Sequence, residues 1–156
     1  MNVLAPISTL MTKELITVHP DDSLDVIQNK FKENNIHHLP VIDTAGKLEG
    51  IISKSDVGYF LRGFTQLIED EMVNATRSRT FKAKDIMTTG IAKLSPTDRL
   101  NVTFEIFNEN LFHAIPIVDD HDQLLGIITT FDILHELSKI EVFSEDIIKA
   151  NKDYNP

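Results

Sequence analysis

The stretch 36-IHHLPVID-43, continued by 50-GIISKSD-56, decides the fold because the chain contains it twice. The second copy reads 112-FHAIPIVD-119 and 126-GIITTFD-132, displaced by the 76 residues that separate Met11 from Met87. The match runs without a gap from Met11 to Leu61 and from Met87 to Leu137. A solenoid needs three or more units, so two copies predict a pair of small units that face each other, with clefts where they meet.

The composition predicts a small globular protein that binds neither nucleic acid nor membranes. The chain has 156 residues, 42% of them hydrophobic, and no apolar run approaches the ~20 residues of a transmembrane helix. Its amino terminus does not read as a secretory signal, and the absence of cysteine excludes disulfides and thiolate chemistry. A net charge of −9 disfavours nucleic-acid and anionic-lipid surfaces, although a local nest of donors can still hold a nucleotide. We expect a cytoplasmic protein.

Each repeat is predicted to form a β-α-β-β-α unit, which makes the protein α/β. An extended segment (15–18 and 91–94) leads into a helix with apolar residues spaced by three and four. Two apolar, β-branched strands and a second helix follow. We expect repeat 1 at 7–61, a helical connector at 62–82, repeat 2 at 83–137, and a C-terminal helix and tail at 138–156.

The doubled, ordered set of motifs resembles the CBS domain, the module named after cystathionine β-synthase. The resemblance rests on Met-Thr before the first strand, Pro-x-x-x-Leu at the first helix, and the two-part signature quoted above. It implies two repeats packed through their sheets into one disc with pseudo-two-fold symmetry and two clefts. It also implies adenosine-containing ligands, pairing of discs into homodimers, and regulation of an effector protein that lies on another chain.

The Ser/Thr-x-x-Asp motifs, Ser53-x-x-Asp56 and Thr129-x-x-Asp132, have two compatible explanations. The first is a helix cap, in which the hydroxyl and the acid satisfy free backbone N–H groups of the second helix. The second follows from the resemblance: the Asp carboxylate accepts both ribose hydroxyls of a nucleotide, and the hydroxyl side chain helps to fix the ligand.

The histidine-containing segments are predicted to face these acids across the clefts. An imidazole before a strand is ordinarily a satisfied polar group at the edge of the core. By resemblance, Thr129 and Asp132 share a cleft with 36–40, and Ser53 and Asp56 share the other with 112–116. His37 and His38 make the first cleft the better phosphate site, whereas Ala114 weakens the second. Lys54 and Ser55 are expected to compensate in part there.

The predicted site contains no catalytic residue and no metal ligand. The sequence lacks a P-loop, a Gly-x-Ser-x-Gly turn and the helical histidine spacing of a zinc enzyme. Adenine contacts are expected around 15–17 and 90–92. The predicted nucleotide-binding residues are Thr17, Ile36, His37, His38, Pro40, Ser53, Lys54, Ser55, Asp56, Ile91, Phe112, His113, Ala114, Pro116, Thr129 and Asp132.

The sequence therefore predicts a non-enzymatic regulatory module that needs no cofactor and binds an adenine nucleotide. AMP, ADP or ATP is preferred over S-adenosylmethionine or NAD. The alternative is a CBS pair without ligand that acts as a scaffold for dimerisation or protein–protein interaction, which Phe131, Ala114 and the few basic residues near the clefts favour. A homodimer is predicted from apolar positions on the second helices and the tail, namely Val57, Phe60, Leu61, Ile133, Leu134, Leu137, Ile140 and Phe143.

Overall fold

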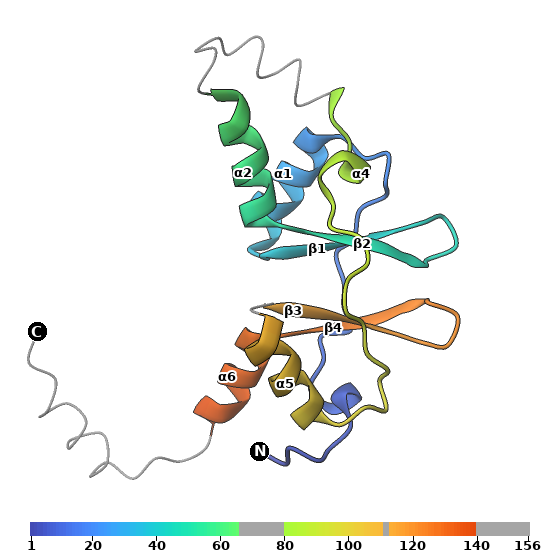
Figure 1. Ribbon diagram of the computed structural model, residues 1–156, viewed down its shortest axis with the longest axis vertical. Helices are drawn as coiled ribbons and strands as arrows, with labels where there is room; N and C mark the ends of the chain where they lie inside the picture. The colour runs from blue at the N-terminus through green and yellow to red at the C-terminus, as the bar shows by residue number, and fades with distance from the viewer. Residues whose placement is uncertain (66–79, 111–112, 140–156) are drawn as a thin grey trace, which may run out of the picture.

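The computed structural model describes residues 1–65, 80–110 and 113–139, and these form two similar lobes (Figure 1). The first lobe contains α1 (Leu24–Asn34), β1 (His38–Ile42), β2 (Leu48–Ser53) and α2 (Lys54–Thr65). The second contains α5 (Leu100–Asn110), β3 (Ala114–Val118), β4 (Leu124–Thr129) and α6 (Thr130–Ser138). A short 3₁₀ helix η1 (Ile7–Thr9) and the short helix α4 (Ala83–Ile86) complete the described elements.

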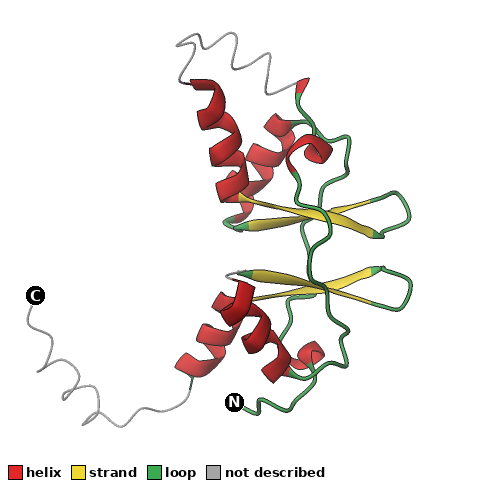
Figure 2. Ribbon diagram, in the orientation of Figure 1, coloured by secondary structure: helices red, strands yellow, loops and turns green. Residues whose placement is uncertain are grey.

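Two antiparallel hairpins with the same register form the centre of the molecule. His38 pairs with Ser53 in the first hairpin, and Ala114 pairs with Thr129 in the second. The register shifts at corresponding places, between Val41 and Ile42 and between Ile117 and Val118. The hairpins face each other, and the helices cover their outer sides (Figure 2). The repeated sequence thus produces a repeated structure, with four layers in the order helix, sheet, sheet, helix.

Alternation along the strands divides each hairpin into two faces. Leu39 and Val41 pack with Leu24, Ile27 and Phe31 of α1 in the core of the first lobe. Ile115, Ile117 and Ile128 do the same for the second lobe with Leu100 of α5. On the other face, Pro40, Pro116 and Ile127 are also buried, which explains why the strands read as apolar runs rather than as alternating sequences.

The predicted first strand of each repeat is reduced to a single bridge residue. Val18 pairs with Val41, and Leu94 pairs with Ile117, each in parallel orientation and outside any named strand. The expectation of strands over 15–18 and 91–94 was therefore wrong in extent. Residues 15–17 and 91–93 form no bridge, and pairing does not continue beyond Val18 and Leu94 because Pro20 and Pro96 follow closely and lack an N–H.

The two repeats exchange their amino-terminal segments, which we call the first arm (residues 3–12) and the second arm (residues 80–88). Ile7 of the first arm is completely buried in the core of the second lobe. Ala83, at the corresponding position of the second arm, is completely buried in the first lobe. Matching backbone hydrogen bonds hold the two arms in three pairs. The first pair is Ile7 N to Asp98 O (2.7 Å) and Ala83 N to Asp22 O (2.8 Å), and the second is Leu100 N to Ala5 O (3.0 Å) and Leu24 N to Phe81 O (2.9 Å). The third is Thr12 N to Ile127 O and Thr88 N to Ile51 O, both 2.9 Å.

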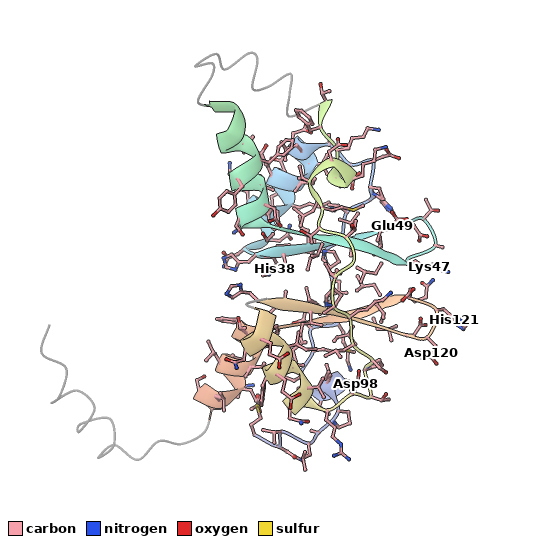
Figure 3. The ribbon with its side chains drawn as sticks, in the orientation of Figure 1. His38, Lys47, Glu49, Asp98, Asp120 and His121 are labelled. Atoms are coloured by element: carbon pink, nitrogen blue, oxygen red, sulfur yellow. The ribbon has the colours of Figure 1, made fainter. Side chains whose placement is uncertain are left out.

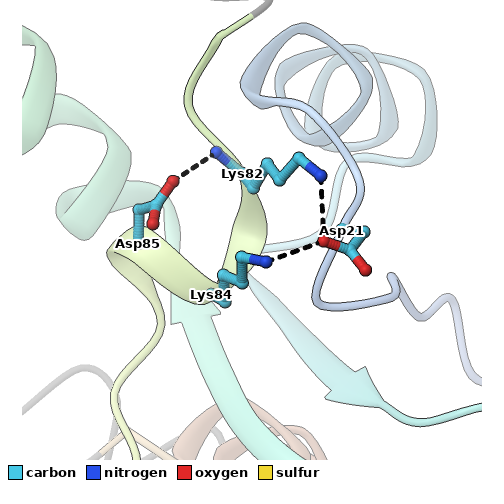
Figure 4. A network of polar contacts seen from close by, with 4 residues as sticks. All are labelled: Asp21, Lys82, Lys84 and Asp85. Atoms are coloured by element: carbon cyan, nitrogen blue, oxygen red, sulfur yellow. Dashed lines mark hydrogen bonds and ion pairs between the residues drawn. The ribbon is translucent and has the colours of Figure 1, made fainter.

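An exposed ion-pair network adds to the contacts of the second arm (Figure 4). Lys82 Nζ and Lys84 Nζ each lie 2.9 Å from Asp21 Oδ1, and the backbone N–H of Lys82 donates to Asp85 Oδ2. The hydrogen bonds from Lys84 and Lys82 lower the pKa of Asp21 to about 2. The carboxylate therefore remains charged, and available to both lysines, over the ordinary pH range.

The hairpins are joined to each other at their turns. Leu48 N donates to Asp122 O at 3.0 Å, and Leu124 N donates to Gly46 O at 3.2 Å. Lys47 and Asp120 lie at this end, whereas His38 lies at the opposite end (Figure 3). Backbone hydrogen bonds therefore hold the two lobes together at the turn end of the hairpins.

Some expectations lie outside the described residues or need correction. The connector is helical as far as Thr65, where α2 ends, and 66–79 and 140–156 lie outside the described residues, including Ile140 and Phe143. Val57 and Ile133 are buried, and Phe60 and Leu61 pack on the core of the first lobe. These four side chains are therefore part of the lobes themselves, while Leu134 and Leu137 remain exposed. No helix of the described ranges is long and apolar enough to cross a membrane.

Gly50→Ala should destabilise the protein because the second arm lies directly over this residue. A Cβ at Gly50 would lie 2.8 Å from the carbonyl oxygen of Thr88 and 3.0 Å from Sδ of Met87. Overpacking of this kind costs roughly 1–3 kcal/mol, which should outweigh the small gain of replacing glycine in a strand. The measurement is the free energy of unfolding in urea. The exposed neighbour Glu49→Ala is the control and should change it by at most about 0.5 kcal/mol; equal effects would contradict the contact.

Candidate functional site

Two pockets open at the end of the hairpins away from the turns. Pocket A has a volume of about 610 Å³ and pocket B about 270 Å³, so pocket A falls inside the usual range for ligand sites, ~300–1,000 Å³, and pocket B slightly below it. Pocket A is lined by Thr12, Asn35, Ile36, His37, His38, Ser53, Lys54, Ser55, His113, Ile127, Thr129, Thr130, Phe131 and Asp132. Pocket B is lined by His38, Ile51, Ser53, Ser55, Asp56, Thr88, Ile91, Ala92, His113 and Ala114.

A complete capping box fixes Asp132 in pocket A. Its Oδ2 accepts hydrogen bonds from the backbone N–H and the hydroxyl of Thr129, both at 2.7 Å, and its own N–H donates to Thr129 Oγ1. The capping explanation of the Thr-x-x-Asp motif is thus confirmed. The same bonds occupy Oδ2 and the hydroxyl hydrogen of Thr129. Oδ1 is the oxygen that remains able to accept from a ligand.

Asp56 in pocket B is held in the same way at the start of α2. Its Oδ2 accepts from the backbone N–H and the hydroxyl of Ser53, again at 2.7 Å, and its N–H donates back to Ser53 Oγ at 3.1 Å. Ser55 Oγ lies 2.7 Å from Ser53 Oγ. A carboxylate oxygen accepts about two hydrogen bonds, so recognition of a diol through both oxygens would disturb either cap.

Each pocket also receives a threonine from the arm that crosses into it. Thr12 lines pocket A, where its Oγ1 lies 3.5 Å from Asp132 Oδ1, and Thr88 lines pocket B. Neither residue was among the predicted site residues. Their signal was present, because both belong to the Met-Thr pairs that open the repeats. What the sequence did not reveal is that each arm crosses to the other lobe.

The structure brings most of the predicted residues together. Ile36, His37 and His38 lie with Thr129 and Asp132 around pocket A. In pocket B, the residues that lie together are His113, Ala114, Ser53, Asp56 and Ile91.

The remaining predicted residues are placed differently. Lys54 lines pocket A and not pocket B, so the expectation that it compensates for Ala114 in the second cleft was wrong. Ser55 lines both pockets. Pro40 and Pro116 are buried in their strands, and Thr17 is not among the residues that line either pocket. Phe112 lies outside the described residues.

His38 lies between the two pockets and resists protonation. Burial lowers the pKa of His38 below its ordinary 6.5, and the charges of His113 and His37 lower it further, while Asp56 acts in the opposite direction. A neutral imidazole is therefore the resting form in the empty protein near neutral pH. An anion beside it would favour the protonated form.

Comparison with known proteins supports one family. The CBS-domain family model matches residues 7–62 and 83–139. The inosine-5'-monophosphate dehydrogenase of Methanocaldococcus jannaschii is 35% identical over 125 residues, which span 80% of this chain and 22% of the dehydrogenase.

Two solved structures have the same fold. The structure of CBSX2 from Arabidopsis thaliana in complex with AMP gives a TM-score of 0.72 at 24% identity and covers 87% of this chain and 98% of that one. The CBS domain pair of protein MJ0100 in complex with 5'-methylthioadenosine and S-adenosyl-L-methionine gives 0.73 at 23%, covering 88% and 99%. The chain belongs to the CBS-domain family, and its predicted α/β fold of two packed repeats is confirmed.

The imidazole of His38 should titrate below pH 6.5 in the ligand-free protein. Because the unfolded chain takes up this proton near pH 6.5 and the folded chain does not, the free energy of unfolding should fall as the pH drops from 6.5 through the lower folded pKa. NMR titration of the histidine ring protons measures the pKa of His38 in the folded and in the unfolded protein. His113→Asn should raise the pKa of His38, whereas His121→Asn, at the distant turn (Figure 3), should not. No change with His113→Asn would refute the coupling.

Proposed function

We propose that this CBS-domain pair is a regulatory module that binds an adenine nucleotide in pocket A and signals its presence to a partner protein. The observation that carries the proposal is the placement of Asp132. Its carboxylate is fixed by Thr129 at the start of α6 through Oδ2, which leaves Oδ1 for a ligand in pocket A, a pocket that basic side chains also line.

The residues of pocket A suit the three parts of a nucleotide. Asp132 Oδ1, next to Thr12, can accept from the ribose hydroxyls without loss of the cap. Ile36 and Ile127 offer an apolar surface to the base, while Lys54, His37 and His38 supply cations or donors for the phosphates. The side chains come from both lobes, so a bound nucleotide would connect them.

The solved relatives support an adenosine moiety as the shared ligand chemistry. Those structures contain AMP, or 5'-methylthioadenosine and S-adenosyl-L-methionine, and all three molecules carry adenine and ribose. Lys54 and the histidines of pocket A favour a phosphorylated ligand for this chain, hence AMP, ADP or ATP.

We further propose that the protein forms a homodimer through α6. Phe131 and Leu134 are 73% and 64% exposed, Leu137 lies on the same helix, and the rings of Phe131 and His135 stack with their centroids 6.1 Å apart. An apolar surface of this kind on a soluble domain is commonly covered by a self-complementary contact. Because Phe131 also lines pocket A, the proposed interface would adjoin the nucleotide site.

Asp132→Asn should weaken AMP binding by at least about tenfold, because a hydrogen bond to a charged group is worth roughly 1.5–3 kcal/mol. Asparagine keeps an oxygen that can accept from Thr129, so the cap is less disturbed than by alanine. Asp56→Asn, at the corresponding position of pocket B, is the matched control and should have the smaller effect. Calorimetry with AMP gives the affinities, and a larger loss from Asp56→Asn would overturn the assignment to pocket A.

A thermal-shift series tests the proposal as a whole. AMP, ADP or ATP at about one hundredfold above its Kd should stabilise the folded protein by ~2.7 kcal/mol, a shift that is readily visible. If no adenine nucleotide shifts the melting temperature at millimolar concentration, the scaffold function without ligand is the better explanation.

Leu134→Asp should convert the proposed dimer to a monomer, because it places a charge in the centre of the apolar α6 surface. Multi-angle light scattering at micromolar concentration measures the mass. Leu4→Asp changes an equally apolar residue that is 57% exposed on the first arm, and it should leave the dimer intact. A monomeric wild-type protein would contradict the proposal.

A further inference from the structure

The two pockets share one wall. Four residues line both of them: His38, Ser53, Ser55 and His113. They lie at the start or end of the paired strands and at the beginning of α2, where the hairpins approach each other. A ligand that touches this wall from one pocket therefore changes the surroundings of a ligand in the other.

The basic groups are distributed unequally around this wall. Pocket A has Lys54 and His37 in addition to the shared imidazoles. Among the described residues that line pocket B, His38 and His113 are the only groups that can carry positive charge, and Asp56 carries negative charge. The described lining of pocket B therefore contributes no cation beyond the two shared imidazoles.

The difference between the pockets can be traced in part to one position of the repeat. Ala114 occupies in the second copy the place of His38, and Thr130, at the place of Lys54, lines pocket A rather than pocket B. Ala114 lines pocket B, together with the apolar side chains of Ile51, Ile91 and Ala92. Pocket B thus retains the acid for a ribose and an apolar surface for a base, but not the groups that hold a phosphate.

We propose that the pockets take different ligands at the same time: a phosphorylated adenine nucleotide in pocket A and an uncharged adenosine-type nucleoside in pocket B. This rests on the proposed nucleotide site in pocket A. A phosphate there draws on the shared imidazoles, and a second phosphate in pocket B would meet the charge of the first and of Asp56 without a cation of its own. A nucleoside has no charge to compensate, so it can fill pocket B beside a bound nucleotide.

Calorimetry on the full chain tests this with AMP and adenosine as probes. AMP alone should bind once per chain. Adenosine added to protein saturated with AMP should then bind once more, and this second event should be lost in Asp56→Asn. If AMP binds twice with equal affinity, or if adenosine only displaces AMP, the inference is overturned while the proposed nucleotide function stands.

Ala114→His supplies the missing group and gives the inference a gain-of-function test. At pH 6, where a histidine of ordinary pKa is largely protonated, this variant should bind a second AMP at least about tenfold more tightly than the wild type does. The gain should vanish at pH 8, where the new imidazole is neutral. Ala45→His, in the exposed turn of the first hairpin, is the matched control and should bind AMP as the wild type does.

The remaining outcomes separate the two proposals. If AMP does not bind but adenosine binds in a manner that depends on Asp56, the nucleotide function of pocket A fails and the preference of pocket B for an uncharged ligand is upheld. If neither probe binds, both proposals fail. If Ala114→His gains no second AMP at pH 6, the lack of a cation is not what excludes phosphate from pocket B, and the inference is overturned.

Discussion

The reciprocal docking of the two arms is the constraint on which the rest of the structure depends. Each lobe obtains one buried core residue, Ile7 or Ala83, from the other repeat. Each hairpin also obtains a backbone neighbour for its second strand, through Thr12 or Thr88. Because both arms carry matching bonds, the lobes are held in a fixed relation, and the pockets between them have a defined shape. Without the arms, neither pocket would contain its threonine.

Much of the fold follows from local sequence. The β-branched runs, the polar turns and the asparagine that ends α1 in a left-handed conformation at Asn35 all act over a few residues. The capping boxes are equally local, since Thr129 and Asp132 lie three residues apart. An offset that repeats in register also predicts two similar units. These features could be predicted because their causes lie within a short stretch of chain.

The main feature that the sequence did not predict is the lobe on which each arm packs. The alignment shows that Met11-Thr12 corresponds to Met87-Thr88, but a repeat looks the same whether its arm packs on its own copy or on the other. The position of Thr12 in pocket A therefore did not follow from the sequence. The end of pairing after Val18 and Leu94 has a local cause in Pro20 and Pro96, and that signal was available. The two pockets share a design, and a few substitutions within it give them different chemistry.

The crossing of the arms also bears on how such a chain could arise and how it can be divided. A single repeat would have an unpaired sheet edge and would lack one buried core residue, because the other repeat supplies both. Its own arm would have no second lobe on which to pack. Two separate copies could complete each other's cores and sheets only by exchanging arms, in a homodimer with true two-fold symmetry. When the two copies lie in one chain, the exchange of arms becomes intramolecular, and the sequences of the two copies can then diverge. For the same reason a cut between the repeats would not release two independent domains: each fragment would carry the piece that completes the other.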